Sequence, residues 1–198
     1  GLAYLLMEDR LRNRILDEIA AVKHRVDVAT DPATDPVVAK DHMRLAHADQ
    51  RVRLLAEASD FIVRREDQVI AEFANGDEID PASIDPEIVM VESESDADLF
   101  RFASLRWSVP VSAGYGRRTR FLLRDRQNGK LIGIFALGDP VIGLAPRDHA
   151  IGWATPERHK NLYHVYDGFV LGGVEPYRQL LGGKLVALTV LSTDVAAY

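Results

Sequence analysis

The sequence predicts an α+β protein in which long N-terminal helices are followed by a mainly antiparallel sheet with helices. Apolar residues recur at helical spacing through most of the first 75 residues. An Asn-Gly pair near residue 128 separates two apolar runs, which is a strong signal for a β-hairpin. The other strand-like runs do not alternate with long helices, as the strands of a parallel sheet would. We therefore expect a helical region over residues 1–84 and an α+β domain over residues 85–198.

The first helix is predicted over about the first 28 residues. Apolar residues with successive spacings of four, four, three and four form one stripe along it: Leu11, Ile15, Ile19, Val22 and Val26. The helix is expected to end within residues 30–36, because two Asp-Pro pairs occur there and the residue before a proline disfavours the helical conformation. Asp35 followed by Pro36 predicts the N-cap and first position of a second helix.

The second helix is predicted to run from Pro36 to the Asn75-Gly76 pair, which is a typical left-handed stop. One seam along it alternates spacings of three and four: Leu45, Ala48, Val52, Leu55, Ser59, Ile62, Glu66, Val69 and Phe73. Because Ser59 and Glu66 interrupt this seam, it is weaker than that of a coiled coil. It fits two helices packed as a hairpin, or one helix against a partner, so a homo-oligomer through the N-terminal helices is one alternative.

The C-terminal elements follow an acidic connector at residues 77–98. The predicted turn of the hairpin is residues 126–129, and residues 156–166 are expected to form a short helix or an extended connection. A final helix over residues 184–191 is predicted to start at a glycine-rich turn. The residues predicted as strands are 87–91, 119–125, 130–137, 149–153 and 168–173.

The composition excludes several classes of chemistry. The chain has no cysteine, so disulfides, cysteine-ligated zinc, iron–sulfur clusters and thiol catalysis are excluded together. No metal site and no cofactor are predicted, because His159 and His164 lack an acidic partner. No apolar run approaches the roughly 20 residues of a membrane span, and no charged-then-apolar leader is present. We therefore expect no membrane partner and a cytoplasmic location.

The net charge of −6 is unevenly distributed along the chain. Residues 1–100 contain 11 Lys and Arg and 23 Asp and Glu, whereas residues 101–198 contain 13 and 7. The first half is therefore acidic, and the second half carries a net charge of +6. This division indicates either a phosphate-bearing partner for the C-terminal half or neutralisation of one half by the other.

The most basic segment is residues 114–120, which combines two glycines with three arginines, Arg117, Arg118 and Arg120. Glycines allow close approach of a ligand to the backbone, and guanidinium groups bind phosphate or carboxylate in bidentate fashion. Tyr115 lies between the glycines and is a candidate for stacking on a base. The alternative is an exposed loop whose arginines pair with the acidic connector.

A second candidate segment is residues 146–153, which contains Arg147, Asp148, His149 and Trp153. His149 is a candidate general base that Asp148 would orient. Adjacent residues of a strand point to opposite faces, however, so these two side chains would not naturally meet. A structural network of Arg147 and Asp148 under Trp153 is the alternative.

The third candidate is residues 175–184, a segment between a predicted strand and a predicted helix that contains Gln179 followed by Gly182 and Gly183. It resembles the pyrophosphate loop of the GNAT acyltransferases, with Lys184 where that family has Gly or Ala. A loop before a helix can bind phosphate through backbone N–H groups, and nearby Tyr177 is a further acid/base candidate. The alternative is a helix start that only packs. The phosphate-binding candidates here are Arg178, Gln179, Gly182, Gly183 and Lys184.

Six ordered blocks carry a resemblance to a known family: residues 106–121, 129–133, 137–140, 147–153, 171–177 and 180–187. They resemble the DruA family of the Druantia anti-phage defence system. The resemblance implies a role in bacterial antiviral defence beside other Druantia proteins, such as a large helicase. It also implies DNA as a partner, because related domains occur alongside transposases, and it implies further elements after residue 198, because family members are longer.

Three hypotheses follow, in order of preference. The first is a defence component that binds nucleic acid through a basic C-terminal face, with Tyr115 or Trp153 stacking on a base. The residues expected to hold phosphate on this face are Arg117, Arg118, Arg120, Arg147 and Lys184. The second is a GNAT-like acyltransferase or a degenerate relative, with His149 or Tyr177 as acid/base candidates. The third is a non-enzymatic assembly subunit that uses the seam of the second helix. Enzymatic activity is left open.

Overall fold

The computed structural model describes residues 2–111, 114–180 and 182–198. The chain forms two compact units, one comprising residues up to Glu57 together with Ser108–Pro110, and the other Ala58–Trp107 together with residues 111–198. The domain boundary predicted near residue 85 stays a prediction, because a compact unit is not by itself an independently folding domain. No helix in the described part of the chain is long and apolar enough to cross a membrane.

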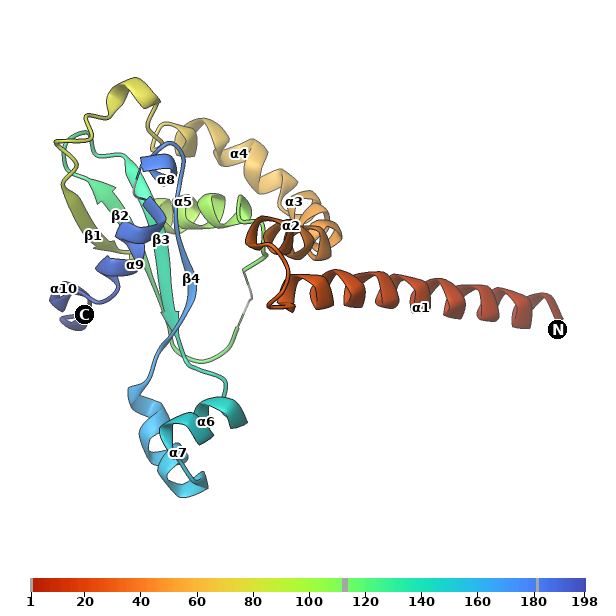
Figure 1. The fold of residues 1–198 in the computed structure, drawn as a ribbon. Helices are drawn as coiled ribbons and strands as arrows, with labels where there is room; N and C mark the ends of the chain where they lie inside the picture. Colours follow the sequence, from red (N-terminus) through yellow and green to blue (C-terminus); the bar gives the residue numbers. More distant parts are fainter. Residues whose placement is uncertain (1, 112–113, 181) are drawn as a thin grey trace. The chain divides into compact units, whose positions relative to one another are not determined.

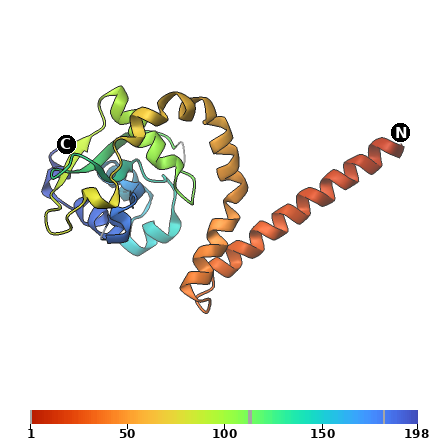
Figure 2. The same cartoon turned by 90° about the horizontal axis from the view of Figure 1, so that it is seen from above.

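The first unit contains α1 (Leu2–Thr30), α2 (Pro36–Ala46) and α3 (Ala48–Glu57). The first of these is one uninterrupted helix, as Figure 2 shows. Asp35 caps α2 as predicted, because its carboxylate accepts hydrogen bonds from the backbone N–H groups of Val37 and Val38. The last part of α1 packs against α2, where the Arg25 guanidinium donates to the backbone carbonyl of Leu45.

The prediction of one continuous helix from residue 36 to residue 75 is wrong in detail. Three helices follow one another there, because the backbone leaves helical geometry at His47 and at Ala58, and α4 spans Ser59–Ile70. The burial of apolar residues changes along these helices. Val52 is exposed in α3, whereas Phe61 and Val69 of α4 are core residues.

The second unit is built on a four-stranded antiparallel sheet with the strands in sequence order (Figure 1). Its strands are β1 (Pro86–Met90), β2 (Arg118–Asp125), β3 (Leu131–Gly138) and β4 (Asp167–Gly173). One row across the sheet aligns Met90, Phe121, Phe135 and Leu171. The predicted antiparallel sheet and its hairpin are therefore confirmed.

Helices cover both faces of this sheet (Figure 1). On one face, α4 and α5 (Glu94–Leu105) bury Phe61, Leu99 and Phe100 against Leu122 and Ile134. The opposite face is covered by α8 (Tyr177–Leu180), α9 (Gly182–Thr189) and α10 (Thr193–Ala196). The core therefore has two halves separated by the sheet, and a side chain on one face cannot share a site with one on the other.

The opposite face has an aromatic core. The rings of Phe121 and Phe135 stack at 4.7 Å, and Tyr177 and Val186 pack beside them. A short 3-10 turn, η1 (Gly76–Glu78), precedes β1 and begins at an Asn75 capping box.

A helical excursion between β3 and β4 lies beyond one end of the sheet (Figure 1). It contains α6 (Ala145–Ile151), α7 (Thr155–Asn161) and the 3-10 turn η2 (Leu162–His164). The strand predicted at residues 149–153 is wrong. Pro146 lies in the first turn of α6, and Gly152 ends the helix with a φ of 82°, so the segment has the two end signals of a short helix.

The contact between β4 and α9 requires glycine at position 173. A Cβ built there would lie 2.8 Å from the carbonyl carbon of Gly182, which is rigid backbone. We expect Gly173→Ala to lower the free energy of unfolding by about 2 kcal/mol, because overpacking forces the helix away from the strand. Urea denaturation checks this. Gly183→Ala is the matched control, because nothing lies within 4 Å of its Cβ position; equal stability of the two variants would contradict the account.

Candidate nucleic-acid interface

The arginines of β2 lie on the face of the sheet that carries α5. The Arg118 guanidinium lies 3.7 Å above the Phe169 ring of β4, and that of Arg120 lies 5.6 Å from the Phe100 ring of α5. An aromatic ring attracts a guanidinium through its electron-rich face. The guanidinium is thereby held over the ring, and the methylene groups of the arginine side chain lie along apolar surface. Arg120 is exposed and Arg118 is partly buried.

Two further arginines, Arg101 and Arg106, lie in and just after α5, and both are exposed. The Arg101 guanidinium lies 4.1 Å from the Phe61 ring, in the same arrangement as the arginines of β2. Within the described residues, no ion pair involves Arg101, Arg106 or Arg120. The sequence analysis missed Arg101 and Arg106. The helical period of Leu99, Phe102 and Ala103 is the signal that would have placed Arg101 on the exposed side.

Arg117 is engaged by protein groups on every side. Its guanidinium forms an ion pair with Asp139 at 2.6 Å and donates to the Tyr166 hydroxyl at 3.0 Å and to the backbone carbonyl of Tyr163 at 2.8 Å. The hydrogen bond from Arg117 lowers the pKa of Asp139, and the same bond raises the pKa of Arg117. Arg117 would bind phosphate, as predicted, only by exchanging these acceptors.

The loop before β2 is fixed to the start of the excursion. The Tyr115 hydroxyl donates to the backbone carbonyl of Pro140 at 3.0 Å, and the ring stays largely exposed. Gly116 has a φ of 71°, and a Cβ there would lie 2.2 Å from the Asp139 carboxylate. Glycine at 116 therefore allows the close approach of the Asp139 carboxylate to this loop.

Arg147 and Asp148 form an internal network of the excursion. Arg147 donates to Asp148 at 2.7 Å and to the backbone carbonyls of Val141 and Ile142, and Arg158 of α7 reaches the other Asp148 oxygen at 3.3 Å. Burial raises the pKa of Asp148, but the hydrogen bonds from the two arginines outweigh it, so the pKa lies below its ordinary value.

The other candidates of this segment lie around that network. His149 is exposed on α6, away from the buried Asp148 carboxylate. Trp153 is partly buried, and its backbone N–H donates to the Asp148 carbonyl at 2.8 Å. Arg147 and Asp148 therefore form the network that the sequence analysis gave as the alternative to catalysis. The Asp148 carboxylate also joins α6 to α7 through Arg158.

The third group of candidates lies across the sheet, on α8 and α9. Tyr177 is buried, and its hydroxyl donates to Asp125 at 2.7 Å, while burial raises its pKa. Arg178 is exposed and forms an ion pair with Glu175. The side chains of Gln179 and Lys184 are also exposed. Leu181 of this motif lies outside the described residues.

The two glycines of this motif differ in their surroundings. Gly182 is buried, and a Cβ there would lie 2.9 Å from the backbone of Tyr177. Gly183 has open space around its Cβ position. The nine residues predicted to bind phosphate therefore occupy three places, and those of β2 and of α9 lie on opposite faces of the sheet.

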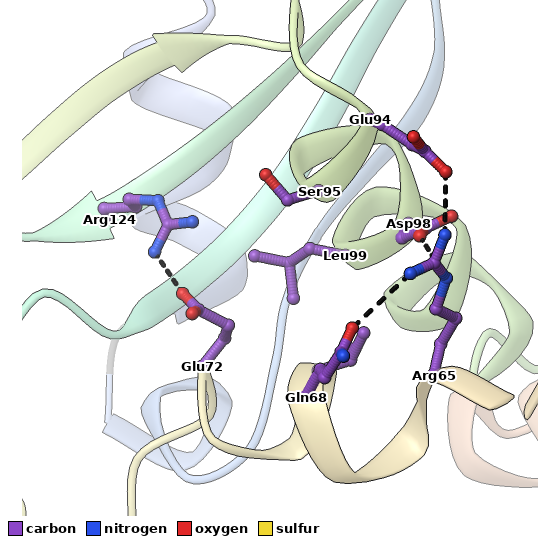
Figure 3. Close-up of a pocket in the computed structure, with 9 residues that line it drawn as sticks. Arg65, Gln68, Glu72, Glu94, Ser95, Asp98, Leu99 and Arg124 are labelled. Carbon is purple, nitrogen blue, oxygen red and sulfur yellow. Dashed lines mark hydrogen bonds and ion pairs between the residues drawn. The ribbon is translucent and has the colours of Figure 1, made fainter. Parts of the chain in front are cut away.

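A cleft of about 470 Å³ lies between α4 and α5, and its lining includes the apolar side chains of Val69 and Leu99. Figure 3 shows Leu99 between the charged groups around Arg124 and Arg65. Arg65 pairs with Glu94 at 2.7 Å and with Asp98 at 2.8 Å along one wall. On the other wall, the Arg124 guanidinium pairs with Glu72 at 2.6 Å and with Asp96 at 3.8 Å. Arg65 and Arg124 thus pair with acidic residues of the connector at residues 77–98, so their charges are largely balanced within the chain. The sequence analysis had offered such pairing as an alternative for the arginines of residues 114–120.

Among the described residues, no group of three or more His, Asp or Glu side chains is placed to hold a metal ion.

The fold and these surfaces define an α+β protein with a four-stranded antiparallel sheet and an arginine-bearing face. The family model for Druantia protein DruA matches residues 38–198. A curated relative, the Druantia protein DruA of Escherichia coli (strain UMEA 4076-1), is 47% identical over 157 residues. The chain therefore belongs to the DruA family.

The match covers 79% of this chain and 39% of the E. coli protein, so the chain spans about two fifths of that relative's length. No solved structure matches the chain at a significant level.

Proposed function

We propose that this chain is the nucleic-acid-binding part of a DruA protein that serves bacterial anti-phage defence, with DNA as the favoured partner. The observation that carries the proposal is the set of arginines on one face: Arg101, Arg118 and Arg120 each lie over an aromatic ring. They belong to the half of the chain with a net charge of +6. Family membership supports the defence role.

This arrangement suits a phosphate backbone. A guanidinium held over a ring has lost part of its conformational freedom before a ligand arrives, so less is lost on binding. The exposed guanidinium groups of Arg101 and Arg120 can donate to phosphate oxygens in bidentate fashion. Contacts of this kind are independent of base sequence and release counterions from the nucleic acid.

Fluorescence anisotropy of labelled single- and double-stranded oligonucleotides tests the proposal. With about three phosphate contacts, raising the salt from about 50 to about 200 mM should lower the affinity roughly 20- to 40-fold. An absence of binding, or binding that does not change with salt, would remove the proposal.

The defence role also implies other Druantia proteins as partners and the bacterial cytoplasm as the place of action. Co-purification of tagged chain with the other proteins of its system, with and without nuclease treatment, tests the partnership. Recovery of partners only when nucleic acid is intact would indicate that the nucleic acid joins them.

A second candidate function is binding of a pyrophosphate-containing ligand, as in a GNAT-like acyltransferase. It is favoured by the order of elements after β4, which leads through Gln179 to the start of α9, and by the open space at Gly183. It is weakened by Gly182, which packs against Tyr177. Calorimetric titration with an acyl-coenzyme A tests it, and the absence of heat at high protein concentration would count against it.

Homo-oligomer formation through α1 is a further proposal, supported by the exposure of its apolar stripe. Met7, Leu11, Ile15 and Ile19 are all largely exposed on this helix. Because an unpaired stripe of this size is costly in water, we expect a dimer or larger assembly. Light scattering after size-exclusion chromatography should show it, and Ile15→Glu with Ile19→Glu should convert it to monomer. A native chain that is monomeric at high concentration would contradict this prediction.

A further inference from the structure

Two tyrosines at the end of the excursion present their rings to solvent. Tyr163 is 68% exposed and Tyr166 is 47% exposed, so both have ring surface open to solvent. Both follow α7 and lie just before β4, which starts at Asp167. Neither was a candidate in the sequence analysis, where residues 156–166 were expected to form a short helix or an extended connection.

Arg117 holds both rings. Its guanidinium carbon lies 4.4 Å from the Tyr163 ring centre and 4.5 Å from that of Tyr166. The same group donates to the Tyr166 hydroxyl and the Tyr163 carbonyl, and Asp139 fixes it from the other direction. The two rings are therefore oriented before any ligand arrives, and binding does not have to order them.

The tyrosines lie at the end of the sheet where β2 begins. Arg117, which touches both rings, directly precedes Arg118 in the chain. Arg118 begins β2 and is aligned with Gly138, whose other neighbour is Asp167 at the start of β4. One end of the sheet thus carries both a guanidinium for phosphate and exposed aromatic rings.

We propose that Tyr163 and Tyr166 form a stacking platform for unpaired bases, so that the nucleic acid bound by this chain is single-stranded. The proposal rests on the proposed function and names its ligand class more closely. In a duplex each base is covered by its neighbours, whereas an unpaired base offers a face to an aromatic side chain. The backbone of the same strand would run over Arg118 and Arg120.

The charged residues around the two tyrosines do not favour single strands over duplexes. The exposed side chains of Glu157 and Lys160 on α7 have opposite charges, and Asp167 is also exposed. A platform without excess positive charge attracts a duplex no more than a single strand. We therefore expect any preference for single strands to come from stacking of unpaired bases on the rings of Tyr163 and Tyr166.

Anisotropy with single- and double-stranded oligonucleotides of one sequence, in DNA and RNA forms, tests the platform. Tyr163→Ala should lower the single-strand affinity by about tenfold, since one stacked base contributes that much, and should leave the duplex affinity unchanged. Tyr163→Phe should restore native binding, because the ring and not the hydroxyl stacks. Tyr198→Ala, which changes an exposed tyrosine near the opposite face of the sheet, is the matched control.

The outcomes separate this inference from the proposed function. Salt-sensitive binding that is equal for single strands and duplexes, and unchanged in Tyr163→Ala, would overturn the platform and leave the proposed function standing. Equal loss of both substrates in Tyr163→Ala, or a loss that Tyr163→Phe does not restore, would also overturn the platform. Absence of binding to any of these oligonucleotides would overturn both.

Discussion

The double substitution Arg118→Ala with Arg120→Ala is expected to lower nucleic-acid affinity by about tenfold at low salt. Each guanidinium is expected to neutralise one phosphate, so the slope of log affinity against log salt should also become shallower by about 1.4 for single strands. Both side chains lie over aromatic rings on one face of the sheet, and neither belongs to the buried core. Anisotropy titrations at several salt concentrations measure both quantities.

Arg126→Ala is the matched control for this experiment. Arg126 follows β2 at its far end, is exposed, and forms ion pairs with Asp85 and Glu87. Its removal changes the net charge by one without touching the proposed interface, so affinity and slope should stay close to native. An Arg118/Arg120 variant that binds as the native chain does would contradict the assignment of these two residues.

The second large effect is expected for stability. Asp125→Ala should lower the free energy of unfolding by about 3 kcal/mol or more, because it leaves several buried donors without an acceptor. The fully buried carboxylate accepts from the backbone N–H groups of Asp85 and Gln127, from the Gln127 amide and from the Tyr177 hydroxyl. Urea denaturation measures the change. Tyr177→Phe, which removes one donor, should cost about 1 kcal/mol; equal costs for the two variants would contradict the network.

The same carboxylate makes stability depend on pH. Burial raises the pKa of Asp125, but the hydrogen bonds from Asp85, Tyr177 and Gln127 outweigh it, so the folded pKa lies below the ordinary value. An acid whose pKa is lowered by folding stabilises the fold above its unfolded pKa of about 4 and loses this contribution as the pH falls through the folded value. The melting temperature should therefore fall below about pH 4, and less steeply in Asp125→Ala. Identical acid profiles would contradict the assignment.

The elements that were predicted correctly depend on local signals. Asn128-Gly129 sets the hairpin because it closes the four-residue turn 126–129, where Gly129 has a φ of 74° and its N–H donates to the carbonyl of Asp125. Asp35-Pro36 sets the start of α2 because a cap needs only its neighbours. The strand predicted at residues 149–153 failed because α6 is too short to display a helical period, and Pro146 and Gly152 were the informative residues.

The candidate site could be predicted only in part, because pairing is a property of the tertiary fold. The basic segment before β2 was visible in the sequence, but the partners that engage Arg117 lie 22 to 49 residues away. The only signal for Arg101 was the helical period of its apolar neighbours, because it is a single basic residue in that helix and not part of a basic cluster. The arginines of β2 and Lys184 lie on opposite faces of the sheet because α9 packs on the face away from α5. No local sequence pattern shows on which face a helix will pack.

Ultraviolet crosslinking of the native chain to a labelled single-stranded oligonucleotide tests the central claim most directly, with the crosslinked residues identified by mass spectrometry. The account predicts crosslinks at the arginine-bearing face and its end, within residues 100–121 and 161–169. Crosslinks confined to residues 175–191, on the opposite face of the sheet, or no crosslinks at all, would contradict it.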